Sequence, residues 1–180
     1  MTDQALVQQL IRKARAAQDS FEGYNQQEVD EVVAAVAWAG YKEENARRLA
    51  HLAYEHTRLG NAQDKLIKVR RKVLGTMQDL KGAKSVGVID VDDEKGLTTI
   101  AKPMGVIAAI QPATHPAATP INNIMIMLKG RNAVILAPHP KGEAACAEVV
   151  RLARQQLAKL NAPLDLVHDS GLERRKQGYW

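Results

Sequence analysis

The first part of the chain carries apolar residues three and four positions apart, which is the period of an amphipathic helix. Asn25 followed by Glu28 has the spacing of a helix N-terminal capping box, Gly40 is a candidate helix end, and Gly60 with Asn61 separates two segments. We therefore predict a helical region over residues 1–84, with apolar stripes at positions 6–14, 29–36, 49–53 and 66–77.

The pattern changes after Gly82. Residues 85–90 and 97–101 are short apolar runs joined by the acidic, glycine-containing turn 92–96. Two such runs separated by a short polar turn are typical of a β-hairpin. We assign residues 85–103 to this hairpin.

Residues 104–167 alternate short apolar runs with helical patterns. The pattern predicts strands at 105–111 and 133–137, helices at 116–129 and 142–160, and a third strand beginning within 164–167. This alternation is typical of a parallel sheet with crossover helices, so the fold class is α/β. Two or three strands are few for a complete doubly wound domain, which indicates a partial sheet. Residues 168–180 lack periodicity and are predicted to be a poorly packed tail.

Composition narrows the classes of function. The 180 residues carry a formal charge of +5 and only 4% aromatic residues, which disfavours readers of single-stranded nucleic acid because these stack bases on aromatic rings. The single cysteine, Cys146, excludes an internal disulfide, and no cluster has the spacing of metal ligands. No long uncharged apolar run is present, so we expect a cytoplasmic protein without a membrane span.

Two proline-bounded turns follow the predicted strands of the sheet. In the turn 111–116, a side chain of Thr114 or His115 could donate a hydrogen bond to a developing oxyanion. The residues alone favour a simpler role, in which Thr114 caps the following helix. The turn 138–142 precedes a helix N-terminus and suits the anionic groups of a nucleotide, although His139 could equally be a structural turn residue. Neither GxGxxG nor GxxxxGK[ST] occurs.

Two other features have simple interpretations. Cys146 lies inside an Ala-rich helix beside Glu143 and Glu148, without an obvious general base, and is predicted to be a buried structural residue. The helix near position 70 has a basic face, which lacks the aromatic or glycine residues of a nucleic-acid groove and is interpreted as a solvated surface; its members are Lys65, Lys68, Arg70, Arg71 and Lys72.

The segment from Ile100 to Ala153, with its Thr-Pro-rich turn, its LKGRNAVI sequence and its APHP turn, resembles the N-terminal, cofactor-binding part of the CoA-acylating aldehyde dehydrogenases. This branch includes acetaldehyde and sulfoacetaldehyde dehydrogenases. The resemblance extends over about residues 5–167, and the tail from His168 does not match.

The resemblance implies an aldehyde dehydrogenase fold with a Rossmann-like sheet that binds NAD or NADP. A cysteine attacks a small aldehyde, hydride passes to the cofactor, and CoA takes the acyl group. The implied cofactor-lining residues are Ile110, Gln111, Pro112, Ala113, Thr114, Ala137, Pro138, His139, Pro140 and Lys141. Thr114 and His115 occupy the two positions at which family members place an oxyanion-hole asparagine. The hairpin would begin an oligomerisation element and make the protein a homo-oligomer.

The family's nucleophilic cysteine lies later in the fold than this sequence reaches, and Cys146 is not at its position. We therefore expect an N-terminal fragment of an acylating dehydrogenase, with sulfoacetaldehyde as a candidate substrate, that is inactive alone. One alternative is a non-catalytic interaction module that docks on a full-length homologue or a compartment shell. A weaker alternative is an anion or nucleic-acid binder that uses residues 65–72.

Overall fold

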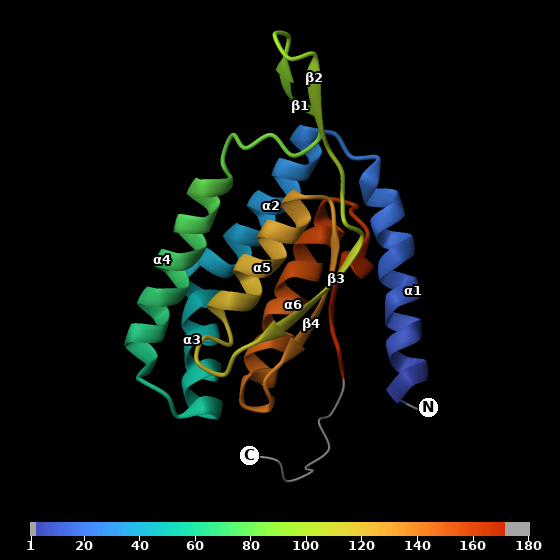
Figure 1. Ribbon diagram of the computed structural model, residues 1–180. Helices are drawn as coiled ribbons and strands as arrows, with labels where there is room; N and C mark the ends of the chain where they lie inside the picture. The colour runs from blue at the N-terminus through green and yellow to red at the C-terminus, as the bar shows by residue number, and fades with distance from the viewer. Residues whose placement is uncertain (1–2, 172–180) are drawn as a thin grey trace.

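The computed structural model describes residues 3–171, and the predicted helical region contains four helices (Figure 1). They are α1 (Asp3–Glu22), α2 (Gln26–Tyr41), α3 (Glu43–Thr57) and α4 (Ala62–Leu80). The capping box before α2 is confirmed, because Asn25 Oδ1 accepts from the Glu28 N–H and the Glu28 carboxylate accepts from the Asn25 N–H. Asn61 Oδ1 similarly accepts from the Asp64 N–H at the start of α4. Local capping therefore fixes both helix starts.

Gly40 does not end α2, which continues to Tyr41. Its missing side chain instead lets α5 (Ala118–Lys129) approach, since a Cβ atom on Gly40 would lie 2.8 Å from Ile121 Cδ1. The predicted helix end is therefore one residue early. The glycine serves close helix packing rather than a helix cap.

The predicted hairpin is confirmed, with strands β1 (Gly87–Asp92) and β2 (Leu97–Ala101). It projects from the body of the protein (Figure 1). Val88 pairs with Ile100 and Val91 pairs with Thr98, and a bulge between the two pairs brings both valines to the same face. Val88, Val91 and Ile100 are each more than half exposed, so this face is apolar and uncovered within the described chain.

A parallel three-stranded sheet, in the order β3-β4-β5, follows the hairpin and confirms the predicted α/β class. Its strands are β3 (Val106–Gln111), β4 (Ala133–Pro138) and β5 (Val167–Asp169). Helix α6 (Glu143–Lys159) connects β4 to β5. Helix α1 packs on one face, while α5 and α6 pack on the other (Figure 1). Helices α2 and α4 pack on α5, and α3 contacts both α4 and α6. Among residues 3–171, no helix is long and apolar enough to cross a membrane.

The third strand begins at the last position of the predicted range 164–167. Residues 164–166 form a 3₁₀ turn, and the strand begins at Val167. His168 and Ser170 are buried, and the Ser170 N–H donates to Leu136 O at 2.7 Å. The prediction of a poorly packed tail is therefore wrong for residues 168–170, because the free edge of β4 supplies hydrogen bonds whatever the side-chain pattern; residues 172–180 lie outside the described part.

Two adjacent buried polar residues connect the sheet to the other elements. Asn132 Oδ1 accepts from the N–H groups of Met104 and Gly105, which fixes the chain as it enters β3. Arg131 donates to Glu22 O at 2.6 Å and to Ala101 O at 3.1 Å, and so joins the end of α1 to the base of the hairpin. Buried charge-assisted bonds of this kind are the strong ones.

Candidate functional site

The two proline-bounded turns lie side by side at the carboxyl edge of the parallel sheet. Ile110 pairs with Ala137 and Gln111 with Pro138 at the ends of β3 and β4. The His139 N–H then donates to Gln111 O at 3.0 Å. Ligands of α/β proteins bind at this edge, where the strands end and the next helices begin.

Gly142 and Pro116 hold the turns against each other. A Cβ atom on Gly142 would lie 2.7 Å from Pro116 Cβ, closer than side chains pack. Gly142 has φ −105°, so the glycine is needed for space and not for an unusual backbone conformation.

The residues predicted to line the cofactor differ in whether their side chains are exposed. Ile110 is 78% exposed, whereas Gln111 is 2% exposed and donates through Nε2 to Ala109 O. The Gln111 amide oxygen accepts from Asn123 Nδ2 at 3.4 Å. At position 111 only the backbone can therefore face a ligand. The remaining predicted residues are half-buried or exposed, namely Pro112, Ala113, Thr114, Ala137, Pro138, His139, Pro140 and Lys141.

His139 has a structural role in the second turn. Its Nδ1 accepts from the Lys141 N–H at 3.1 Å and caps the short 3₁₀ turn Pro140–Gly142. Helix α6 follows directly, and its N-cap, Gly142, makes no side-chain capping bond. The helix therefore begins without a side-chain acceptor at its positive end.

Thr114 does not cap the helix that follows it. The N-cap of α5 is Ala117, and no side chain caps that position. Thr114 is exposed, and its carbonyl oxygen accepts from Lys65 Nζ at 3.4 Å. The Lys68 Nζ lies 3.5 Å from His115 Nε2, so two lysines of α4 contact the turn.

Sequence reasoning interprets the helix face of these lysines mainly as a solvated surface and gives it a binding role only in the weaker alternative of an anion or nucleic-acid binder. Their contact with the turn was not predicted. Burial, and then the neighbouring Lys68 ammonium, lower the pKa of Lys65. Arg70, on the same helix, instead pairs with Glu43 at 2.6 Å. Among the ion pairs of residues 3–171, none includes Lys65 or Lys68.

Cys146 is fully buried in α6, as predicted. Burial, with smaller contributions from Asp169 and Glu143, raises the pKa of its thiol to about 12. A thiol in this state supplies almost no thiolate at neutral pH and is not placed to attack a substrate.

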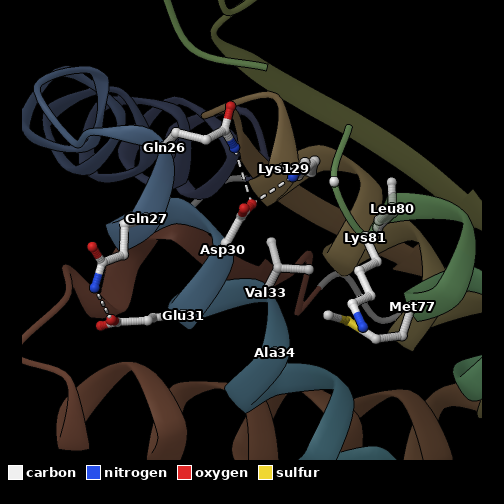
Figure 2. A pocket seen from close by; sticks show the side chains of 11 residues that line it. Gln26, Gln27, Asp30, Glu31, Val33, Ala34, Met77, Leu80, Lys81 and Lys129 are labelled. Atoms are coloured by element: carbon white, nitrogen blue, oxygen red, sulfur yellow. Dashed lines mark hydrogen bonds and ion pairs between the residues drawn. The ribbon is translucent and has the colours of Figure 1, made fainter. Parts of the chain in front are cut away.

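A separate cavity of about 570 Å³ lies between α2 and the end of α4 (Figure 2). Gln26 and Lys129 both bond to Asp30 in its wall, with Lys129 Nζ 2.5 Å from Asp30 Oδ1. Lys129 is almost wholly buried, so this pair fixes α5 against α2. Elsewhere in the described chain, no group of three His, Cys, Asp or Glu residues could hold a metal ion.

Comparisons with known proteins identify the family to which the chain is related. The aldehyde dehydrogenase family matches residues 1–167. A sulfoacetaldehyde dehydrogenase from an Acholeplasma species is 48% identical over 157 residues, covering 87% of this chain and 32% of its own length. An acylating sulfoacetaldehyde dehydrogenase from Bilophila wadsworthia is 44% identical over 161 residues, covering 89% of this chain and 35% of its own length.

Solved structures give the same result. An acetylating aldehyde dehydrogenase from Geobacillus thermoglucosidasius superposes with a TM-score of 0.89 at 33% identity, over 96% of this chain and 38% of that one. A propionaldehyde dehydrogenase from Rhodopseudomonas palustris, solved with bound CoA, has a TM-score of 0.76 at 28% identity, over 90% of this chain and 36% of that one. The chain spans about a third of the length of the curated relatives named above. It belongs to the aldehyde dehydrogenase family, and its sequence corresponds to the N-terminal part of the acylating members.

Proposed function

We propose that this chain forms the cofactor-side wall of a CoA-acylating aldehyde dehydrogenase, which converts an aldehyde, CoA and NAD(P)⁺ to an acyl-CoA and NAD(P)H. The observation that carries the proposal is the pairing of the two proline-bounded turns at the carboxyl edge of a parallel sheet in a chain of this family. In the structure these turns are residues 112–117, between β3 and α5, and residues 139–142, between β4 and α6. Sulfoacetaldehyde is the proposed aldehyde, since the two relatives named above carry it in their names.

The residues at this edge fit a dinucleotide. Ile110 offers an exposed apolar surface at the end of β3, which suits a flat adenine ring. Beside it, α6 begins without a side-chain cap, and Lys141 is exposed just before its start, so both features favour phosphate oxygens. When bound, the nicotinamide group accepts the hydride of the aldehyde carbon.

The first turn is proposed to face the aldehyde. The exposed Thr114 hydroxyl and the half-buried His115 ring are the groups available to donate a hydrogen bond to the carbonyl oxygen as it gains charge. The attacking thiol is taken to come from outside residues 3–171, because Cys146 is buried and protonated.

Titration of the 180-residue chain with NAD⁺, NADP⁺ and CoA, followed by amide chemical shifts, tests the nucleotide site. The shifts caused by NAD⁺ or NADP⁺ are expected to gather at residues 110–114 and 141–145. An Ile110→Glu variant, which places a charge where adenine should lie, is expected to weaken them, while Ile126→Glu on exposed α5 surface serves as the control. Shifts confined to other parts of the chain, or none at millimolar nucleotide, would contradict the proposal.

A second proposal concerns assembly through the hairpin. The apolar face of Val88, Val91 and Ile100 supports pairing with another copy of the protein, since monomeric proteins rarely expose such a cluster on a projecting element. Sedimentation of the chain should give a homo-oligomer that Val91→Lys dissociates and Thr99→Lys, one pair away on the other face, does not. A monomeric wild-type chain that binds a full-length homologue or a compartment shell protein would favour the interaction module instead.

A further inference from the structure

The strongest unexplained cluster joins α4 to the turn between β3 and α5. Lys65 Nζ lies 3.4 Å from Thr114 O, and Lys68 Nζ lies 3.5 Å from His115 Nε2. Both lysines and the turn line one small recess, together with Val69 and Pro116. Three nitrogen-bearing side chains therefore meet around residues 114 and 115.

This cluster carries positive charge that no carboxylate neutralises within the described chain. The half-buried Lys65 and the exposed Lys68 are absent from its ion pairs, whereas the half-buried Arg70 pairs with Glu43 and the buried Lys129 pairs with Asp30. The two ammonium groups repel each other, in accord with the lowered pKa of Lys65. An anion bound between them would remove this repulsion.

The position of the cluster determines which anion fits. Because the lysines contact the same turn that is proposed to face the aldehyde carbonyl, a group only a few bonds from that carbonyl would reach them. We propose that Lys65 and Lys68, with His115, recognise the anionic end of a short aldehyde that carries a sulfonate or carboxylate. The inference rests on the proposed function, since it takes the turn 112–117 as a wall of the aldehyde site.

The recess itself is too small for a phosphate and also for a sulfonate. Its volume is about 10 Å³, room for about one water molecule, and its lining is otherwise apolar, with Ala53, Ala117 and Ala118 beside Val69. A bound anion would therefore lie at the mouth of the recess, against the Lys65 and Lys68 ammonium groups. The response of the His115 ring to a sulfonate and to a bisphosphate separates an anionic aldehyde from a nucleotide phosphate as the occupant.

The test uses the full 180-residue chain and 2-hydroxyethanesulfonate, a stable analogue of sulfoacetaldehyde, with NMR detection at the His115 ring and the Thr114 amide. Lys65→Met and Lys68→Met are each expected to weaken binding by about fivefold, the effect of losing one partly exposed ion pair. Lys72→Met, which removes the same charge from α4 outside the recess, is the matched control and should leave the affinity unchanged. Lys65→Arg should retain binding, which separates loss of charge from loss of folding.

Two further probes complete the test. The uncharged analogue 1-propanol and the bulky adenosine 3′,5′-bisphosphate are both expected to leave the His115 ring unshifted. Equal weakening by Lys72→Met, a response of His115 to the bisphosphate alone, or no response to the sulfonate would overturn the inference. None of these readouts needs turnover or a nicotinamide cofactor, so a failed nucleotide titration and a failed sulfonate titration are distinguishable.

Discussion

Gly142 lies so close to Pro116 that a single added methyl group would meet the proline ring at 2.7 Å. This contact sets the spacing between the two turns at the carboxyl edge of the sheet. This contact joins the start of α6 and the turn with Thr114 and His115 into one rigid surface. A structural change in one of them should therefore shift the other.

Gly142→Ala is expected to destabilise the chain by about 1–3 kcal/mol, because the Pro116 ring cannot move aside without shifting its turn. Gly75→Ala is the matched comparison. Gly75 lies inside α4 with open space around its Cα, so alanine there should stabilise by up to about 1 kcal/mol through its higher helix propensity. Urea unfolding measures both effects, and equal stabilities for the two variants would contradict the close contact.

The buried Lys129 should respond asymmetrically to substitution. Asp30→Ala leaves the ammonium buried without its partner and is expected to cost about 2 kcal/mol, less than a fully buried pair would because Asp30 is partly exposed. Lys129→Met removes the buried charge, so no acidic partner is needed, and should leave the free energy of unfolding nearly unchanged. Chemical denaturation of the two variants checks the order, and a larger loss for Lys129→Met would show that the ammonium itself stabilises the fold.

His168 should make the fold sensitive to acid. Burial lowers the pKa of this imidazole; Arg154 and Lys13 act in the same direction, while Asp165 and Asp169 oppose the shift. In the unfolded chain His168 takes up a proton near pH 6.5, whereas in the folded chain it does so only at lower pH. The contribution of His168 to the free energy of unfolding is therefore fully present above pH 6.5 and is lost progressively as the pH falls below it. The slope approaches about 1.4 kcal/mol per pH unit for one group.

Comparison of the wild type with His168→Gln isolates this contribution. Unfolding free energies measured at pH 7.5 and pH 5 should differ less in the variant than in the wild type. A pH dependence identical in the two proteins would exclude His168 as its source.

Cys146 should be chemically silent in the folded protein. With its thiol fully buried and its pKa raised to about 12, alkylation by iodoacetamide should proceed only through unfolding, at a rate that rises with urea. The 180-residue chain is accordingly expected not to oxidise aldehydes by itself. Rapid native-state labelling, or turnover that Cys146→Ser abolishes, would assign this cysteine the role that its burial excludes.

Sequence patterns predict those features of the fold that depend on local chemistry. The capping residues Asn25 and Asn61, the acidic hairpin turn and the short apolar strands each specify their element within a few residues. Interactions between distant segments were not predictable in the same way. Gly40 serves contact with α5 and does not end its helix, and the last strand depends on the free edge of β4 and not on its own periodicity.

The same distinction applies to the candidate site, of which local sequence patterns predicted one part and long-range packing determined the other. The two turns could be found from their prolines and from the strands before them. The approach of Lys65 to Thr114 joins residues 49 positions apart, and the basic pattern of α4 is that of an ordinary solvated helix face. Only the packing of α4 on α5 brings these charges to the turn.

A chimeric enzyme tests the central claim most directly. Residues 1–167 of this chain would replace the matching segment of the Bilophila wadsworthia acylating sulfoacetaldehyde dehydrogenase, to which it is 44% identical. The measurement is formation of NADH or NADPH from sulfoacetaldehyde, with and without CoA. Turnover that requires both the aldehyde and CoA is the predicted result. A chimera that folds and assembles like the parent enzyme but forms no reduced cofactor would contradict the assignment of this chain as the cofactor-side wall of an acylating aldehyde dehydrogenase.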